Sequence, residues 1–428
     1  MSTLVENMPS AKTTSPAKGV RHYFHKIGVS VLFSGAAVGV SHVVQATRAG
    51  ADFSLALLPT ILLCLLLKYP AFLFGPLYTT VTGESVVRGY SRIGKWTLPL
   101  VAVSFLCVMF TVVSAVALLS AGIALATTSA TINITALAIG LIVLSTILSL
   151  YFSYQRFQEA MKVVFFILVS LSVFSLAMAL PQWRTASFEI HWTTLRKEEV
   201  FFIAALIGWM PAGLDLPMMH SQWLLAKGRP SADAVEDFNF GYLSTTVLAV
   251  LFLVIGAVFF YGTGTSLVAS AGGFSRQLLD AYTNALGNSG RWVIGITLFL
   301  AIFSTLAVVV DGFPRVLSEV LSLYSRTGAA THDHSLRYRQ ASSWTQFAGA
   351  TVILLAFTGS LTALVDFATI VSFLICPIFA FLNHRITSLP DFRAKHKVSR
   401  SLRVWSLMGI LFFTLFTLYY FYLNSLGS

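Results

Sequence analysis

The sequence predicts an all-α integral membrane protein of about eleven transmembrane helices, and three observations support this fold class. The chain has 428 residues, of which 56% are hydrophobic and only 11% are charged, and its mean hydropathy is +0.78. Soluble domains carry about 25% charged residues. Apolar segments long enough to cross a bilayer recur along the whole chain. Two of these segments, five helices apart, are interrupted by glycine, proline and polar residues.

The expected spans are apolar stretches of roughly 17–25 residues. They cover residues 27–47, 54–75, 97–124, 132–153, 160–181, 200–225, 239–263, 291–312, 344–360, 364–383 and 404–424. Residues 1–26 then form a polar, basic N-terminal tail.

The distribution of positive charge predicts the orientation of the spans. Most of the 28 Lys and Arg residues lie in the N-terminal tail and in the loops after even-numbered spans. Because such loops stay in the cytoplasm, we expect a multi-pass protein of the cell membrane, in bacteria the inner membrane, with a cytoplasmic N-terminus. The net charge of +11 is thereby explained, and the expected surroundings are the lipid bilayer and no nucleic acid.

The sixth span is broken in its middle. Pro211, Gly213 and Pro217 lie close together, and the carboxylate of Asp215 lies among them. Proline lacks a backbone N–H and clashes with the preceding turn, so the sequence predicts an interruption of the regular helix there. Backbone groups freed in a membrane are tolerated only where they face protein or a wet cavity. A broken span with an ionisable side chain therefore indicates a substrate-binding site; the alternative is that Asp215 caps the second half-helix.

The first span has a comparable weak middle, in which Gly35 and Gly39 are followed by polar Ser41 and His42. The two interrupted spans are five helices apart, and a repeat of five helices places its second copy in inverted orientation. We therefore expect a first five-helix repeat at 27–181, an inverted second repeat at 200–383 and an additional helix at 404–424. The substrate would bind at the midplane, where the two breaks meet.

Several polar side chains near the breaks are candidates for substrate or ion binding. Asp215 suits a cation or an amine, and His42 is a ligand, a proton carrier or a structural hydrogen-bonding group. The Met210 thioether suits softer metals, although buried methionine usually fills space. Ser304 and Thr305 carry hydroxyls suited to a sodium ion held against the carbonyls of the first span; the alternative is bonding to their own helix.

Other polar residues are assigned to the ends of spans or to loops. We expect Asp311 to end the eighth span, Asp366 to begin the tenth, and Lys68 to extend from the second span toward the membrane interface. His332-Asp-His334 is expected in a solvated loop, because it is an incomplete set of metal ligands. The chain has no phosphate-binding glycine loop or nucleophile motif, so neither an ATP-driven pump nor an enzyme is expected.

The order of several motifs resembles that of the natural-resistance-associated macrophage proteins (NRAMP), divalent-metal transporters with the inverted five-plus-five architecture called the LeuT fold. Residues 48–52, Arg-Ala-Gly-Ala-Asp, are similar to that family's Ala-Gly-Ala exit from the first span. Thr82-Gly-Glu-Ser85 is similar to its Thr-Gly-Arg-Asp stretch, Met210-Pro211 to the start of its Met-Pro-His motif, and His220-Ser221 to a later His-Ser. The resemblance covers roughly the first ten spans.

The chain departs from that family at the metal ligands. Gly39 stands where the family has aspartate, His42 where it has asparagine, Ala212 where it has the histidine of Met-Pro-His, and Thr369 where it has glutamine. The third and ninth spans also lack charged residues in their cores, where the family's proton route has acidic and arginine side chains. The resemblance thus implies the following substrate-binding candidates: Gly39, Ser41, His42, Met210, Ala212, Asp215 and Thr369, with Asp215, His42 and Met210 as metal ligands.

The resemblance implies a secondary transporter that moves a divalent metal cation by alternating access. The metal would be cargo, and no cofactor is expected. The first alternative is transport of a small organic solute such as an amino acid, coupled to sodium through Ser304 and Thr305. The second alternative is a membrane sensor or scaffold that transports nothing.

Overall fold

The computed structural model describes residues 28–183, 187–188, 196–228, 233–264, 267–268, 270–325, 332–357 and 360–425. The predicted N-terminal tail, 1–26, lies outside these ranges, as do the side chains of His332, Asp333 and His334. All elements within the described ranges are helical.

The described part of the first half of the chain contains nine elements. They are α2 (Val29–Val38), the π-helix η2 (Ser41–Ala46), α3 (Thr47–Phe53), α4 (Leu58–Thr82), α5 (Val86–Ile93), α6 (Thr97–Thr128), α7 (Ile134–Tyr151), α8 (Tyr154–Ala179) and the 3-10 helix η3 (Leu180–Gln182).

The second half forms α9 (Lys197–Trp209), α10 (Leu216–Ala226), α11 (Ala234–Phe260), α12 (Ala271–Leu286), α13 (Asn288–Tyr324), α14 (His332–Ala356), α15 (Leu361–Ile386), α16 (Pro390–Lys395) and α17 (Arg400–Ser425).

The lengths and hydropathies of these helices confirm a multi-pass, all-α membrane protein. Within the described ranges, eight helices are long and apolar enough to cross a membrane: α4, α6, α7, α8, α11, α13, α15 and α17. The pair formed by α2 and the η2–α3 segment, bent by 45°, is a ninth. The other two predicted spans correspond to the α9–α10 pair and to α14. Helices α9 and α10 have 13 and 11 residues, so each is shorter than a bilayer of about 30 Å.

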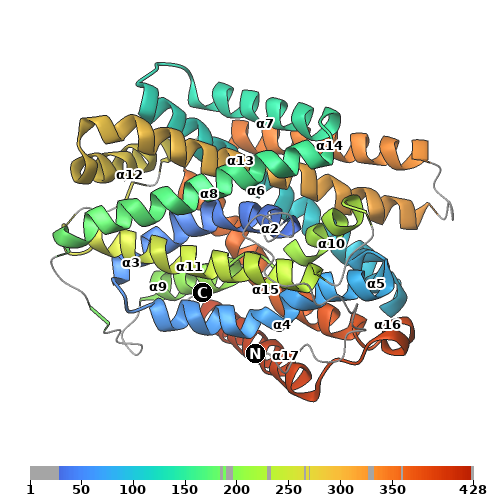
Figure 1. Ribbon diagram of the computed structural model, residues 1–428. Coiled ribbons are helices and arrows are strands. Elements are labelled where there is room, and N and C mark those ends of the chain that lie inside the picture. The colour runs from blue at the N-terminus through green and yellow to red at the C-terminus, as the bar shows by residue number, and fades with distance from the viewer. Residues whose placement is uncertain are drawn as a thin grey trace, which may run out of the picture.

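The two longest helices, α6 and α13, run beside each other through the molecule (Figure 1). Helices α2 and α3 pack along α11, and α9 packs against α15. Helix α17 packs against α4 and α15, at the red edge of the bundle in Figure 1. The broken helices α2 and α10 therefore lie inside a sheath of continuous ones, so their irregular backbone is covered by protein.

Helices α3 and α11 approach so closely that neither tolerates a side chain at the crossing point. A Cβ atom on Gly50 would collide with the carbonyl oxygen of Leu253, and one on Gly256 would collide with the carbonyl oxygen of Thr47. Small residues at such crossings let helix backbones pack directly in membrane proteins.

One sequence expectation about a helix end is wrong: Asp311 does not end its helix, because α13 continues past it to Tyr324. Helix α4 likewise continues through Pro70 and Pro76 to Thr82. In both helices the apolar pattern continues beyond the prolines, and burial against neighbours outweighs the backbone hydrogen bond lost at each. The connection between the predicted spans 239–263 and 291–312 contains a further helix, α12. Ser270 caps its N-terminus by accepting a hydrogen bond from the amide of Gly273.

Candidate functional site

The break in the sixth span is a six-residue segment without helical structure between α9 and α10. Helix α9 ends at Trp209, and α10 begins at Leu216. The Met210–Pro211 peptide bond is cis. Because Pro211 has no N–H, the carbonyl of Ile207 lacks its helical partner, and the chain leaves the helix there as the sequence predicts.

Asp215 occupies the N-cap position of α10, with only 6% of its surface exposed. Its side chain makes no capping hydrogen bond to the amides of the first turn. Among the described residues, no side chain donates a hydrogen bond to its carboxylate, although the positive charge of Lys68 acts on it electrostatically. The Asp215 side chain therefore does not cap α10, which was the alternative role that the sequence left open.

A cavity, which we call the break cavity, lies between the break, α2 and the helices α6 and α13. Its volume is about 40 Å³, enough for about three water molecules at 10–15 Å³ each. Its lining residues are Ala36, Ala37, Val40, Ser41, Val108, Val112, Val116, Trp209, Ala212, Gly213, Asp215, Leu216, Met219, Thr305, Val309 and Phe313.

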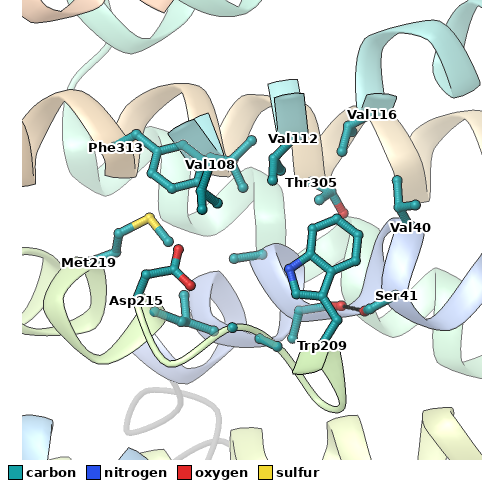
Figure 2. Close-up of a pocket in the computed structure, with 16 residues that line it drawn as sticks. Val40, Ser41, Val108, Val112, Val116, Trp209, Asp215, Met219, Thr305 and Phe313 are labelled. Carbon is teal, nitrogen blue, oxygen red and sulfur yellow. Dashed lines mark hydrogen bonds between the residues drawn. The ribbon is translucent and has the colours of Figure 1, made fainter. Parts of the chain in front are cut away.

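The lining is aliphatic and aromatic apart from three polar side chains. Figure 2 shows Asp215 and Trp209 pointing from the break toward the side chains of α6 and α13. Ser41 and Thr305 are the other two polar side chains at the cavity. Both hydroxyls already donate to backbone carbonyls, Ser41 to Ala37 and Thr305 to Gly35. Asp215 is therefore the one polar lining side chain that has no side-chain or cross-helix partner in the described structure.

His42 points away from the break cavity and is fully buried. Its Nε2 lies 2.9 Å from the carbonyl oxygen of Thr245 on α11, and its Nδ1 lies 3.0 Å from that of Ala37 and 2.7 Å from the hydroxyl of Ser41. Both ring nitrogens thus have protein partners. The histidine joins η2 to α11 and braces the π-helical turn.

The remaining sequence candidates divide into those at the cavity and those behind its wall. Ala212 lines the cavity, whereas Met210 is fully buried and does not. The Thr369 hydroxyl donates to the carbonyls of Val365 and Asp366 on its own helix. The structure thus brings Ser41, Ala212 and Asp215 together at one cavity and leaves the side chains of His42, Met210 and Thr369 out of it.

Gly39 lies at the bend of the first span, directly against α13. A Cβ atom at this position would lie 2.5 Å from Cγ2 and 2.8 Å from Oγ1 of Thr305. The backbone of the first span comes so close to Thr305 of α13 that glycine, which has no Cβ atom, fits at this position.

A second, smaller cavity lies between α2, α8 and α13, and we call it the α2–α13 cavity. Its volume is about 10 Å³, about one water molecule. Ser304 and Thr305, both predicted as ion ligands, line it together with Gly35 and Val38. The Ser304 hydroxyl donates to Ala301 at 2.7 Å, and Thr305 donates to Gly35 at 2.7 Å.

Lys68 is the residue whose position the sequence predicted wrongly. Its side chain is fully buried, and Nζ lies 2.7 Å from the carbonyl oxygens of Ile207 and Gly208 and 3.3 Å from that of Ala212. It therefore reaches the broken end of α9 and does not extend to the membrane interface. The signal in the sequence was its place in the middle of an apolar span, where an unpartnered charge is too costly.

His220, the later histidine of the resemblance, is fully buried on α10. Its ring packs against Phe33 and Phe238, with ring centroids 5.6 and 5.9 Å away. Neither ring nitrogen has a hydrogen-bond partner in the described structure.

Two ion-pair groups lie near the broken spans, and one of them joins the first span to a continuous helix. Arg48 at the end of the first span binds Asp366 on α15 at 2.8 Å. Asp311 on α13 binds Arg315 and Arg339 at 2.7 and 2.8 Å. Asp311 therefore sits in a continuous helix as the centre of a charged cluster, whereas the sequence predicted a helix end.

Among the described residues, no three His, Cys, Asp or Glu side chains lie close enough together to hold a metal ion. Of the predicted set, Asp215 lines the break cavity, whereas His42 and Met210 do not. The side chains at that cavity that could ligate a metal are the carboxylate of Asp215 and the thioether of Met219.

The two broken spans, the buried carboxylate between them and the surrounding sheath of helices define a membrane protein of the LeuT fold. Solved structures with this arrangement include a mutant form of the Eremococcus coleocola manganese transporter, with a TM-score of 0.72 and 12% identity over 95% of this chain and 88% of that one. MhsT in complex with L-phenylalanine has a TM-score of 0.63 and 12% identity over 96% of this chain and 100% of that one. Mhp1, described as a nucleobase-cation-symport-1 family transporter, has a TM-score of 0.59 and 13% identity over 94% and 92%.

The chain belongs to the same family as the Pasteurella multocida protein described as uncharacterized protein PM0681. The two are 31% identical over 406 residues, which is 92% of this chain and 91% of that protein. No family model matches the chain. The solved structures confirm the LeuT fold, and their low sequence identities show the fold alone.

Proposed function

We propose that the protein is a secondary transporter that carries a small solute with a cationic amine group across the membrane by alternating access. The observation that carries the proposal is the buried carboxylate of Asp215, which faces the break cavity without a side-chain partner. A carboxylate kept away from water requires a positive partner or a proton. A cationic cargo supplies that partner by a charge-assisted hydrogen bond.

The rest of the lining favours an organic cation over a bare metal ion. Trp209 and Phe313 contribute aromatic rings. The face of an aromatic ring attracts an ammonium group. Valine and alanine side chains cover most of the other walls and suit the carbon atoms of a solute. A divalent metal would instead need several oxygen, nitrogen or sulfur ligands.

The break also disfavours a cargo recognised mainly through its own carboxylate. Such a group would bind the free amides at the N-terminus of α10. The first amide there, on Leu216, already donates to Gly213, and Pro217 has none. The negative charge of Asp215 at the same place would repel a second carboxylate.

A divalent metal cation is the second candidate cargo. The observation that favours it is the similarity in fold to the Eremococcus coleocola manganese transporter. Asp215, His42 and Met210 would then have to come together in another state of the transport cycle. This requires His42 to release its bonds to Ala37 and Thr245.

Alternating access would move the broken spans against the continuous ones. In this proposal the repeats are residues 27–181 and 200–383, with 404–424 as an additional helix. In this proposal the Arg48–Asp366 pair and the Asp311 cluster act as two separate contacts, each of which would open in one state of the cycle. The α2–α13 cavity is then the place for a coupling sodium ion bound by Ser304 and Thr305.

The test is a binding screen on the purified full chain in detergent, followed by uptake into proteoliposomes. Thermal unfolding is recorded with small primary amines, with neutral analogues of the same size, with amino acids, and with Mn²⁺ and Mg²⁺. We expect a saturable rise in unfolding temperature with one or more amines, and loss of that rise in Asp215→Asn. The proteoliposomes should accumulate the same amine when an ion gradient is applied.

Asp280→Asn is the matched control, because Asp280 is an exposed carboxylate that pairs with Arg291 far from the break. It should keep both binding and uptake. Binding of Mn²⁺ lost in Asp215→Asn, with no response to amines, would favour the metal cargo. No response to any ligand, together with no uptake, would favour the sensor or scaffold and contradict the proposal.

The proposed location is the bacterial inner membrane with the N-terminus in the cytoplasm, which the loop charges support. Reporter fusions after residue 26 and after residue 425 test this. The first should be active only as a cytoplasmic reporter and the second only as a periplasmic one. If both fusions reported the same side of the membrane, the odd number of spans would be contradicted.

A further inference from the structure

We infer that the broken end of α9 is a binding site for an alkylammonium ion, and that the side chain of Lys68 fills it permanently. The site consists of three backbone carbonyl oxygens, those of Ile207, Gly208 and Ala212. Only the consequence of this site for the transport cycle rests on the proposed function. The site itself is argued from the contacts of Lys68.

The carbonyls are available because of the local sequence. In a regular helix Ile207 would accept from residue 211, but Pro211 has no N–H to donate. Helix α9 ends at Trp209, so the carbonyl of Gly208 also lies in the last turn, where partners are missing. Leu206, one residue earlier, still has its helical bond from the amide of Met210. The break thus frees acceptors at one particular point.

The geometry matches an ammonium group. A lysine ammonium has three N–H donors and no acceptor, and three carbonyl oxygens lie within 2.7–3.3 Å of Nζ. The C-terminus of a helix also carries partial negative charge, which favours a cation. The ring of Phe413 on α17 lies 5.7 Å from Nζ and provides a further cation–π contact.

The same turn of α4 offers a second contact to the break. Cys64, one helical turn before Lys68, places its sulfur 3.3 Å from the carbonyl oxygen of Ile207 and 3.5 Å from that of Met210. Helix α4 therefore holds the unwound segment from the side opposite the break cavity. Lys68 carries the only full charge on that side among the described contacts.

The consequence for transport is that the positive charge at the break belongs to the chain and does not depend on a bound inorganic ion. In LeuT-fold transporters generally, unwound carbonyls at a midplane break attract cations. Here Lys68 supplies that cation from the chain itself, and its positive charge acts on Asp215 across the break. Lys68 is thus a positioning residue that keeps the Asp215 segment in place while cargo is exchanged.

The test is chemical rescue of a truncated lysine, measured as thermal unfolding of the purified full chain. Lys68→Ala removes the ammonium and leaves its volume empty, whereas Lys68→Met fills most of the volume without a charge. We expect both variants to unfold roughly 5 °C or more below the parent. Ammonium, methylammonium or ethylammonium chloride should restore Lys68→Ala in a saturable manner, and tetramethylammonium chloride at equal concentration should not.

Lys68→Met should not respond to these cations, because its side chain occupies the space. Lys162→Met is the control for loss of a buried membrane lysine, because Lys162 pairs with the Glu159 carboxylate one turn away on its own helix. It should show a smaller loss and no rescue. If Lys68→Ala cannot be purified, Lys68→Gln, which keeps two N–H donors, replaces it and should be intermediate in stability.

Two outcomes would overturn the inference. One is a Lys68→Met variant as stable as the parent, because the carbonyls would then need no cation. The other is a folded Lys68→Ala that no small ammonium ion stabilises. Neither outcome involves cargo binding, which is measured separately with Asp215→Asn. Failure of the Lys68 rescue experiment therefore leaves the proposed transport function intact. Failure of the Asp215→Asn binding screen likewise leaves the proposed ammonium site intact.

Discussion

The indole Nε1 of Trp223 donates a hydrogen bond to the Asp311 carboxylate at 3.1 Å, and this contact joins α10 to α13. The same carboxylate accepts hydrogen bonds from Arg315, Arg339 and Ser149. One buried aspartate thus holds the second half of the broken span to three other helices. Its charge is fully paired, in contrast to that of Asp215.

The first prediction concerns this cluster. Asp311→Asn should lower the free energy of unfolding by about 3–5 kcal/mol, because two half-buried guanidinium groups lose their counter-charge. Trp223→Phe should cost about 1–3 kcal/mol, since it removes one of the two donors to Oδ2 of Asp311 and leaves only Arg315 there. Trp405→Phe is the control, because Trp405 donates to the Leu66 carbonyl at a more exposed place. Urea or thermal unfolding checks the order, and equal losses in all three variants would contradict it.

A second prediction concerns the crossing of α3 and α11. Gly50→Ala and Gly256→Ala should each cost about 1–3 kcal/mol, because the added methyl group must push two backbones apart. Gly140→Ala in α7 is the matched control, since nothing lies within 4 Å of a Cβ atom there. That variant should be neutral or slightly more stable, because alanine favours the helix. Unfolding temperatures of the three purified variants test this contrast.

The Arg48–Asp366 pair leads to a prediction about local opening. The exposed fractions of these side chains are 18% and 38%, so the pair should contribute less than about 1 kcal/mol. Arg48→Met should leave the unfolding temperature nearly unchanged. Hydrogen exchange in residues 45–53 and 361–369 should nevertheless accelerate, by roughly two- to fivefold. Arg291→Met, which breaks the pair with Asp280, should affect only its own surroundings. Unchanged exchange in both segments would show that the pair does not hold them together.

The α2–α13 cavity leads to a prediction about sodium. If a sodium ion binds there, replacing choline by sodium should raise the unfolding temperature, since a ligand at 100 times its Kd stabilises by about 2.7 kcal/mol. Thr305→Val should lose the rise, because it removes one of the two hydroxyls at the cavity. Ser120→Ala is the control, since Ser120 is equally buried but bonds only to its own helix. A sodium effect of the same size in all variants would place the ion elsewhere.

The sequence was sufficient for the approximate positions of the spans and for the break around Pro211. The hydropathy of a segment and the effect of a proline on its helix depend on residues that are neighbours in the chain, so both can be read from the sequence. The orientation of Lys68 was not predictable, because it depends on which face of α4 lies against the break. The same holds for His42, whose partners are backbone carbonyls on other turns and on α11.

The apolar lining of the break cavity could not be predicted either. Val108, Val112 and Phe313 look in the sequence like any other membrane residues, since valine and phenylalanine serve equally against lipid and against a cavity. Helix α12 was missed because a short amphipathic helix has a low mean hydropathy. For the cavity lining, the missing information was which helix each side chain packs against, and the helical conformation itself was predicted.

The contact between Gly39 and Thr305 has an evolutionary consequence. A side chain introduced at position 39 would collide with the threonine as it lies here, so the aspartate that the resemblance places there requires Thr305 to shift or to be replaced. A smaller residue at position 305 would remove the collision. The two positions should therefore vary together among relatives, and the mutational path between an aspartate-bearing first span and this one passes through a double change.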